Sequence, residues 1–215
     1  LQFWFCRNPG LALPLIALQY HEVKINLSLS ASYGSGTSGI KVWADYFYLD
    51  TDERRRFAQV SHEYLIEQVQ FVNTTSTTSH ELNFNHPIKE LVWTGGDTAG
   101  VPTAVDTGST YKLTLNGHDR FAERDYRYFT RAQVYQHHTG FGSVTTRDSI
   151  AVYSFALKPE EHQPSGTCNF SRIDNAQLKI DTAVVTDNTA GTPGGTLAAP
   201  TTLHVYALNY NVLRV

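Results

Sequence analysis

The strongest constraint in this sequence is an alternation of apolar and polar residues with a period of two. In residues 23–30 the odd positions hold Val, Ile, Leu and Leu, and the even positions hold Lys, Asn, Ser and Ser. Successive side chains of a β-strand point to opposite faces, so this alternation buries one face and leaves the other to water. The segment is therefore predicted to be a strand whose register is fixed by its apolar face.

Other segments rich in β-branched and aromatic residues also predict strands. These segments are residues 40–49, 89–94, 111–115, 150–157 and 203–215. Residues 62–71 fit both helical and strand spacing, and we favour a strand. Residues 150–157 are almost continuously apolar, which is typical of a central strand covered on both faces.

One short helix is expected near residues 51–58. Asp50 and Glu53 have the spacing of a capping box, in which two side chains satisfy the free backbone amides of a helix start. Long segments of small residues separate the strands, and β patterns resume after each of them, so none predicts a domain linker. We expect a single domain over residues 1–215, an all-β, eight-stranded jelly-roll sandwich.

Composition excludes several classes of protein. With 41% hydrophobic residues the chain is not a disordered one, and its uninterrupted apolar stretches are shorter than the ~20 residues that cross a bilayer. The net charge of −3 argues against nonspecific nucleic-acid binding by the domain as a whole. Cys6 and Cys168 lie far apart without a Cys-x-x-Cys spacing, which predicts free thiols.

Patterns for catalysis or metal binding are weak. His137 and His138 are adjacent, whereas a strand aims residues two apart at one metal ion. No serine occupies a Gly-x-Ser-x-Gly elbow, and neighbours such as Glu160 and Glu161 rarely reach the geometry of a glycosidase carboxylate pair. We expect no enzyme, cofactor or metal site. A glycan-binding module is the alternative, with Tyr33 or Phe141 stacking on a sugar.

A basic stripe stands out between residues 120 and 131. Its arginines fall at helical spacing and are Arg120, Arg124, Arg127 and Arg131. Aromatic residues interleave with them, as on a surface that stacks nucleic-acid bases. Asp119, Glu123 and Asp125 neutralise much of the charge, which favours an ion-paired segment that forms an interface. A turn at Asn116–Gly117 is predicted to lead into this segment.

Three Asn-x-Ser/Thr sequons occur, at Asn26, Asn73 and Asn169. Asn26 falls within the alternating segment described above. Asn73, in a threonine-rich segment expected to be a loop, is the candidate glycosylation site.

Six segments, in the same order along the chain, resemble the major capsid proteins of the large nucleocytoplasmic DNA viruses, the chlorella-virus, iridovirus and mimivirus type. They include Leu49-Asp-Thr-Asp-Glu-Arg-Arg-Arg-Phe-Ala58 and Leu115-Asn-Gly-His-Asp-Arg-Phe121, together with residues 5–23, 85–93, 157–175 and 206–215. The resemblance spans both ends of the sequence and is highly specific in residues 157–175.

The resemblance implies two consecutive jelly rolls, of which this chain is the second, C-terminal one, with the first absent. Three copies of such a protein form a capsomer with a pseudo-hexagonal footprint in an icosahedral shell. The implied partners are two further copies, neighbouring capsomers, minor capsid proteins and, through other proteins, the inner viral membrane, with no direct contact to nucleic acid. The implied location is the virion, after assembly in the host cytoplasm.

This resemblance suggests roles for particular residues. We expect Phe3 and Trp4 to be buried against a neighbouring jelly roll, and Arg120, Arg124 and Arg127 to set the register between subunits. Because Pro159 and Pro164 fix backbone angles and Ser165–Gly166 supplies a tight turn, residues 158–172 are expected to form a rigid extended loop that supports contacts within the capsomer.

Overall fold

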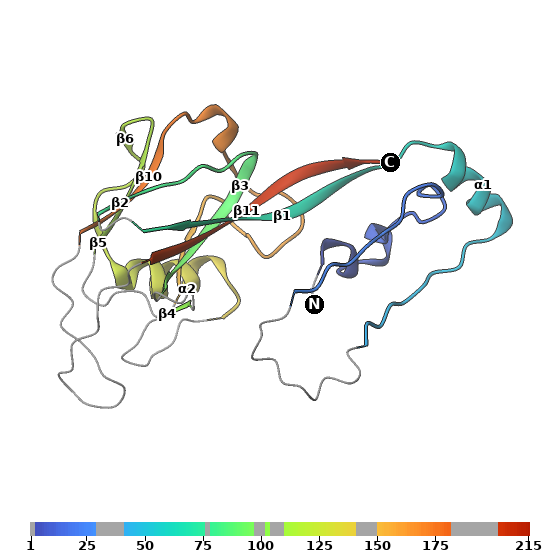
Figure 1. The fold of residues 1–215 in the computed structure, drawn as a ribbon, viewed down its shortest axis with the longest axis horizontal. Coiled ribbons are helices and arrows are strands. Elements are labelled where there is room, and N and C mark those ends of the chain that lie inside the picture. Colours follow the sequence, from blue (N-terminus) through green and yellow to red (C-terminus); the bar gives the residue numbers. More distant parts are fainter. Residues whose placement is uncertain are drawn as a thin grey trace. The chain divides into compact units, whose positions relative to one another are not determined.

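The computed structural model of the chain divides into two compact units, Leu1–Ile66 with Val212–Val215, and Glu67–Asn211 (Figure 1). The residues that the structure describes are 3–28, 41–75, 78–96, 102–103, 110–140, 150–181 and 202–215. Each unit is treated by itself below.

Two antiparallel sheets make up most of the larger unit. The first follows the order β1-β11-β3-β4, and β8 and β9 also pair with β3. Its strands are β1 (Glu63–Thr74), β3 (Pro87–Gly96), β4 (Pro102–Thr103), β8 (Ala151–Ser154), β9 (Cys168–Asn169) and β11 (Thr202–Arg214). The second follows the order β2-β10-β5-β6, and β7 pairs with β5. Its strands are β2 (Ser79–Glu81), β5 (Thr110–Leu115), β6 (His118–Asp119), β7 (Arg124–Asp125) and β10 (Ala176–Asp181). The all-β, two-sheet prediction is confirmed.

The core comes from alternate residues of these strands. Trp93 of β3 lies opposite Val205 of β11, and Leu113 of β5 lies opposite Leu178 of β10; all four are buried. Full burial of an aliphatic side chain such as Val205, Leu113 or Leu178 stabilises the fold by about 1.5–3 kcal/mol. Because the alternation has a period of two, both sheets direct one apolar face into the same hydrophobic cluster.

A helical segment completes this core. Residues Tyr128–Ala132 form a π-helix that continues into α2, Gln133–His137. Phe129 is fully buried, with its ring centroid 5.1 Å from that of Trp93 and 5.8 Å from that of Tyr111. The side chain of Gln133 accepts a hydrogen bond from the Ser154 amide at 3.1 Å, which ties α2 to β8.

Most predicted elements are present. Strands occur where they were expected in residues 62–71, 89–94, 111–115 and 203–215. β8 is shorter than the predicted segment, but all four of its residues are buried, as expected of a central strand. The helix α1 (Thr51–Gln59) has the predicted capping box. The Asp50 side chain accepts from the Thr51 amide at 2.7 Å, and the Asp50 amide donates to Glu53 at 3.1 Å.

Two strand predictions are wrong in the described residues. Residues 23–28 and 41–50 have no regular secondary structure, and Val23, Ile25 and Leu27 are each about half exposed. An alternating pattern specifies which face is buried, but a strand also needs neighbouring strands to pair with its backbone groups. The strand β10 was missed, although Ala176, Leu178 and Ile180 alternate with polar residues and gave a usable signal.

The loop between β8 and β9 contains a tightly packed glycine. Gly166 has φ +147°, and a Cβ atom placed on it would lie 2.8 Å from the carbonyl oxygen of Phe155 and 3.3 Å from Cα of Ala156. Only glycine takes this backbone conformation without strain, and backbone atoms cannot move aside as a flexible side chain can.

We predict that Gly166→Ala lowers the free energy of unfolding by about 1–3 kcal/mol, the range for strained backbone at such positions. Urea denaturation of the chain measures this change. Gly140→Ala is the matched control, because nothing lies within 4 Å of the added methyl group. Equal stability of the two variants would contradict the role assigned to Gly166.

Candidate assembly surfaces

A tight turn sets the position of the basic stripe. Asn116 and Gly117 have φ values of 50° and 79° and join β5 to β6, as predicted. Positive φ at both central positions is the signature of a type I′ hairpin turn. The Asn116 side chain accepts hydrogen bonds from the amides of Asp174 and Asn175, at 2.9 and 3.1 Å, which fixes the turn to the segment before β10.

The four arginines of the stripe are all exposed, and we call them the arginine face: Arg120, Arg124, Arg127 and Arg131. The interleaved residues Phe121, Tyr126 and Phe129 are buried instead, so they belong to the core and offer no stacking surface for bases. The Arg124 guanidinium lies 4.2 Å from the centroid of the Tyr128 ring. Such contact with an aromatic face orients the cation.

The acidic residues of this segment have other partners. Asp119 forms an ion pair with Lys112 at 2.7 Å, and Glu123 accepts a hydrogen bond from the hydroxyl of Thr110. Asp125 accepts from the backbone amide of Arg127 at 2.9 Å. These carboxylates thus fasten the segment to β5 and to its own backbone.

The smaller unit contains the N-terminal aromatic residues. Phe3 stacks on Phe5 with ring centroids 5.0 Å apart, and Trp4 meets Phe5 edge-on at 5.3 Å. Trp4 also lies 6.0 Å from Tyr64, at the start of β1. Phe3, Trp4 and Phe5 remain partly exposed, so each retains apolar surface that another chain can cover.

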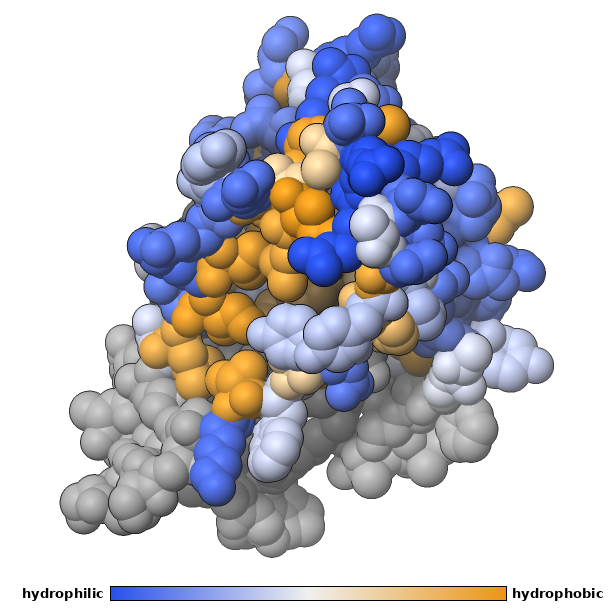
Figure 2. Space-filling view, turned by 90° about the vertical axis from the view of Figure 1, so that its right-hand side faces the viewer, coloured by the Kyte–Doolittle hydropathy of each residue, from blue (hydrophilic) through white to orange (hydrophobic). Residues whose placement is uncertain are grey.

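Large apolar side chains are also exposed elsewhere in the smaller unit. They include Trp43 and Tyr48, which are 87% and 95% exposed. On the face displayed in Figure 2, residues of high hydropathy gather in one patch bordered by hydrophilic residues; tryptophan and tyrosine do not rank as hydrophobic on that hydropathy scale, so Trp43 and Tyr48 are not what marks this patch. Extended apolar patches on a protein surface commonly mark sites of protein–protein contact.

The candidate glycosylation site differs from its prediction. Asn73 is exposed but lies inside β1, next to the last residue of that strand, and not in a loop. The Asn169 side chain caps a short 3-10 helix by accepting from the Ser171 amide at 3.1 Å. Asn26 is exposed and lies outside any strand. Tyr33 and Phe141, the candidate sugar-stacking residues, lie outside the described residues.

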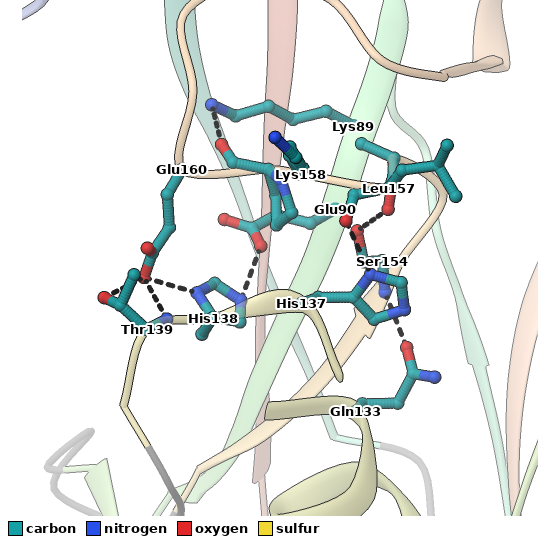
Figure 3. Close-up of polar contacts among 12 residues, drawn as sticks. Lys89, Glu90, Gln133, His137, His138, Thr139, Ser154, Leu157, Lys158 and Glu160 are labelled. Carbon is teal, nitrogen blue, oxygen red and sulfur yellow. Dashed lines mark hydrogen bonds and ion pairs between the residues drawn. The ribbon is translucent and has the colours of Figure 1, made fainter. Parts of the chain in front are cut away.

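One cluster of titratable groups was not anticipated (Figure 3). His138, at the end of α2, lies between two carboxylates: Nε2 is 3.1 Å from Oε2 of Glu90 in β3, and Nδ1 is 3.2 Å from Oε1 of Glu160. The same Glu160 oxygen accepts from the amide and hydroxyl of Thr139, at 3.1 and 3.2 Å. Contact with Glu90 raises the pKa of His138, and the Thr139 hydrogen bonds lower the pKa of Glu160.

A second cluster of charged groups is centred on Lys89, the residue that precedes Glu90 in β3. Lys89, only 1% exposed, donates to Glu67 of β1 and to the carbonyl of Pro159, both at 2.7 Å. Its ammonium also lies 5.4 Å from the centroid of the Tyr210 ring. His162 Nδ1 is 3.8 Å from the same Glu67 oxygen. Two consecutive residues of β3, Lys89 and Glu90, therefore both connect to the loop that follows β8.

That loop is compact and does not match the extended conformation predicted for residues 158–172. The Ser165 hydroxyl accepts from the Lys158 amide at 2.9 Å and lies 3.3 Å from the Lys158 carbonyl, which closes the segment on itself. We call residues 157–166 the latch loop. The segment closes at Ser165 and Gly166, the two residues at which a tight turn was expected.

The described residues contain no group of three or more His, Cys, Asp or Glu side chains arranged to hold a metal ion. Cys6 and Cys168 are free, as predicted. In the described part of the chain, no helix has both the length and the apolar character needed to cross a membrane.

Comparison with known proteins gives consistent matches. The family model for the large eukaryotic DNA virus major capsid protein matches residues 53–215, and the model for the major capsid protein N-terminus matches residues 1–50. The chain is 52% identical to the major capsid protein of Pyramimonas orientalis virus and 41% identical to that of Paramecium bursaria Chlorella virus 1, in each case over 100% of its length. It spans 58% and 63% of those two relatives.

Solved structures agree. A quasi-atomic model of the PBCV-1 virus capsid matches with a TM-score of 0.73 and 37% identity, over 100% of this chain and 67% of that one. The Faustovirus major capsid protein, at 9% identity and a TM-score of 0.54, shares the fold. The two-sheet sandwich is thus that of a viral jelly-roll capsid protein. The chain belongs to the family of large eukaryotic DNA virus major capsid proteins.

We predict that Lys89→Ala lowers the free energy of unfolding by about 3–5 kcal/mol, because removal of one partner leaves the Glu67 carboxylate, 9% exposed, without its cation. Lys158→Ala is the control, since the Lys158–Glu161 pair is 67% and 57% exposed and such a pair contributes at most about 1 kcal/mol. Urea denaturation compares the two variants. An equal loss of unfolding free energy in Lys89→Ala and Lys158→Ala would contradict the larger contribution predicted for the buried Lys89–Glu67 pair.

Proposed function

We propose that this chain is a shell-building part of a major capsid protein and that its function is structural. The observation that carries the proposal is the similarity, over the whole chain, to a chain in a model of an assembled virus capsid. The implied product is the icosahedral shell of a large DNA virus, and the implied location is the virion, after assembly in the host cytoplasm. No catalytic role is part of this proposal.

We also propose a domain assignment. Residues 53–215 are the C-terminal jelly roll, in agreement with the range of the longer family match. Residues 1–50 match the model for the N-terminal part of the family, and Val23, Ile25 and Leu27 alternate with polar residues there. We infer that in the whole protein this segment pairs with strands of an N-terminal jelly roll. This refines the expectation of one domain over residues 1–215.

The unit of assembly that we propose is a homotrimer whose subunits meet through the arginine face and the N-terminal aromatic residues. Arg120, Arg124 and Arg127 supply exposed cations on a segment that Phe129 anchors in the core. Phe3 and Trp4 supply apolar surface that is only partly buried. Aromatic residues and arginine are enriched at protein interfaces, so both surfaces have suitable composition.

The further partners are neighbouring capsomers and minor capsid proteins, and the inner viral membrane through those proteins. We propose no direct contact with nucleic acid, because three of the aromatic residues between the arginines are buried in the core and the ring of the fourth, Tyr128, faces the Arg124 guanidinium. Nothing in the described residues favours the glycan-binding alternative.

We predict that Arg124→Ala and Arg127→Ala each weaken the trimer of the full-length protein, with a dissociation constant raised about tenfold, which corresponds to ~1.4 kcal/mol. Mass photometry over a dilution series measures the change. Arg55→Ala on α1 is the control, an exposed arginine outside the arginine face. Unchanged trimer mass at every concentration in both variants would overturn the assignment of this surface.

We predict that Trp4→Ala also weakens the trimer, because a partly buried indole loses its remaining exposed surface when another jelly roll covers it. The Tyr64 ring beside Trp4 remains in place. Tyr135→Ala is the control, an exposed aromatic residue of α2 that belongs to neither proposed surface. A wild-type dilution curve for Trp4→Ala would contradict burial of this residue between subunits.

A further inference from the structure

His138 has a carboxylate at each of its two ring nitrogens, whereas a simple ion pair needs only one. Both ring nitrogens face carboxylate oxygens, Glu90 on one side and Glu160 on the other. A neutral imidazole has one N–H donor and one acceptor lone pair, whereas the imidazolium has two donors. Both contacts are therefore favourable only when His138 carries a proton.

The two carboxylates come from different parts of the chain. Glu90 is 5% exposed and belongs to β3, which is paired with its neighbouring strands. Glu160 belongs to the latch loop and is more exposed. His138 thus connects a strand of the sheet to a surface loop through a single titratable ring (Figure 3).

We propose that His138 is a proton-dependent latch that holds residues 157–166 against the sheet and releases them when the imidazole loses its proton. Without the proton, one ring nitrogen presents a lone pair to a carboxylate. The repulsion is costly at Glu90, because that carboxylate is buried and cannot turn to water. Glu160 can do so, since it is partly exposed, and the loop around it is then held against the sheet mainly by the Lys89 hydrogen bond to the Pro159 carbonyl.

Other charged and titratable groups lie near His138, and their contacts show which of them can cause a pH-dependent release of the loop. Glu90 from β3 and Glu160 from the latch loop face the ring directly. Lys89 and His162 both contact Glu67, on the second connection between the loop and the sheet. His137 lies 3.1 Å from the carbonyl oxygen of Leu157, an uncharged partner. Among these histidines, His138 has carboxylates at both nitrogens.

The direction of the pH dependence follows from these contacts. The pKa of His138 is raised above 6.5, so its contribution is complete below that value and is lost as the pH rises through the folded pKa. The pKa of Glu160 is lowered from 4.5, so its contribution is lost only as the pH falls through that lower value. Both contributions are complete only between the two ordinary pKa values, 4.5 for Glu160 and 6.5 for His138, so the loop is held most firmly in that range.

Hydrogen–deuterium exchange of the full-length protein tests the latch. Exchange is followed by mass spectrometry from about pH 5.5 to about pH 8.5, on both sides of the ordinary histidine pKa, and corrected for the intrinsic effect of pH. We expect amides of residues 157–166 to lose protection as the pH rises, by about tenfold for each unit by which folding raises the His138 pKa. Protection in β10 should stay constant.

Variants identify the titrating group. His138→Gln should remove the pH-dependent step and leave the loop weakly protected at every pH. Glu160→Gln keeps an oxygen acceptor for Thr139 but removes the charge, so it should lower the midpoint of the step. His162→Gln is the control and should keep the step. A wild-type loop whose protection does not depend on pH, or a step that survives His138→Gln, would overturn the proposal. Neither outcome bears on assembly into a capsid.

Discussion

The pairing of β3 with four other strands is the constraint on which the first sheet depends. β11, β8, β4 and β9 all pair with β3, so its backbone groups are used along both edges. Its alternating side chains then have fixed directions. Leu91 and Trp93 enter the core, where the Phe129 ring packs on Trp93 and links the helical segment to the sheet. The position of the arginine face depends on this buried ring and on the Asn116–Gly117 turn that precedes the segment.

The same strand buries two charges, and this explains the conformation of the latch loop. Lys89 and Glu90 are 1% and 5% exposed. A buried charge is expensive unless it is paired and hydrogen-bonded, so each requires a partner at a defined place. The Glu67 carboxylate and the Pro159 carbonyl meet that requirement for Lys89, and the His138 ring, 3.1 Å away, meets it for Glu90. The loop is therefore positioned by the electrostatic needs of β3 as well as by its own turn residues.

The sequence was enough to predict those elements that are stabilised by contacts between residues close to one another in the chain. The capping box of α1 and the Asn116–Gly117 turn each depend on residues within a few positions of one another. The pairing of Glu90 with His138 joins residues far apart in the sequence, and no pattern near either residue indicates it. Residues 23–28 fail for the same reason: their alternation is clear, but a strand exists only where another strand pairs with it. Buried aromatic residues in the basic stripe were also hidden, because the stripe does not form one regular helix: Phe121 and Tyr126 precede the π-helix and only Phe129 lies within it.

The basic stripe has two roles: its buried aromatic residues stabilise the fold, and its exposed arginines are proposed to bind another subunit. Burial and exposure separate these roles. Phe121, Tyr126 and Phe129 contribute to stability because they are buried, and their replacement would disturb the core whether or not subunits associate. The arginines between them are exposed, and exposed charges contribute little to the stability of a single chain. At an interface the same charges select a partner and a register. Loss of an arginine should therefore affect association while the fold stays intact, whereas loss of a neighbouring aromatic residue should affect both.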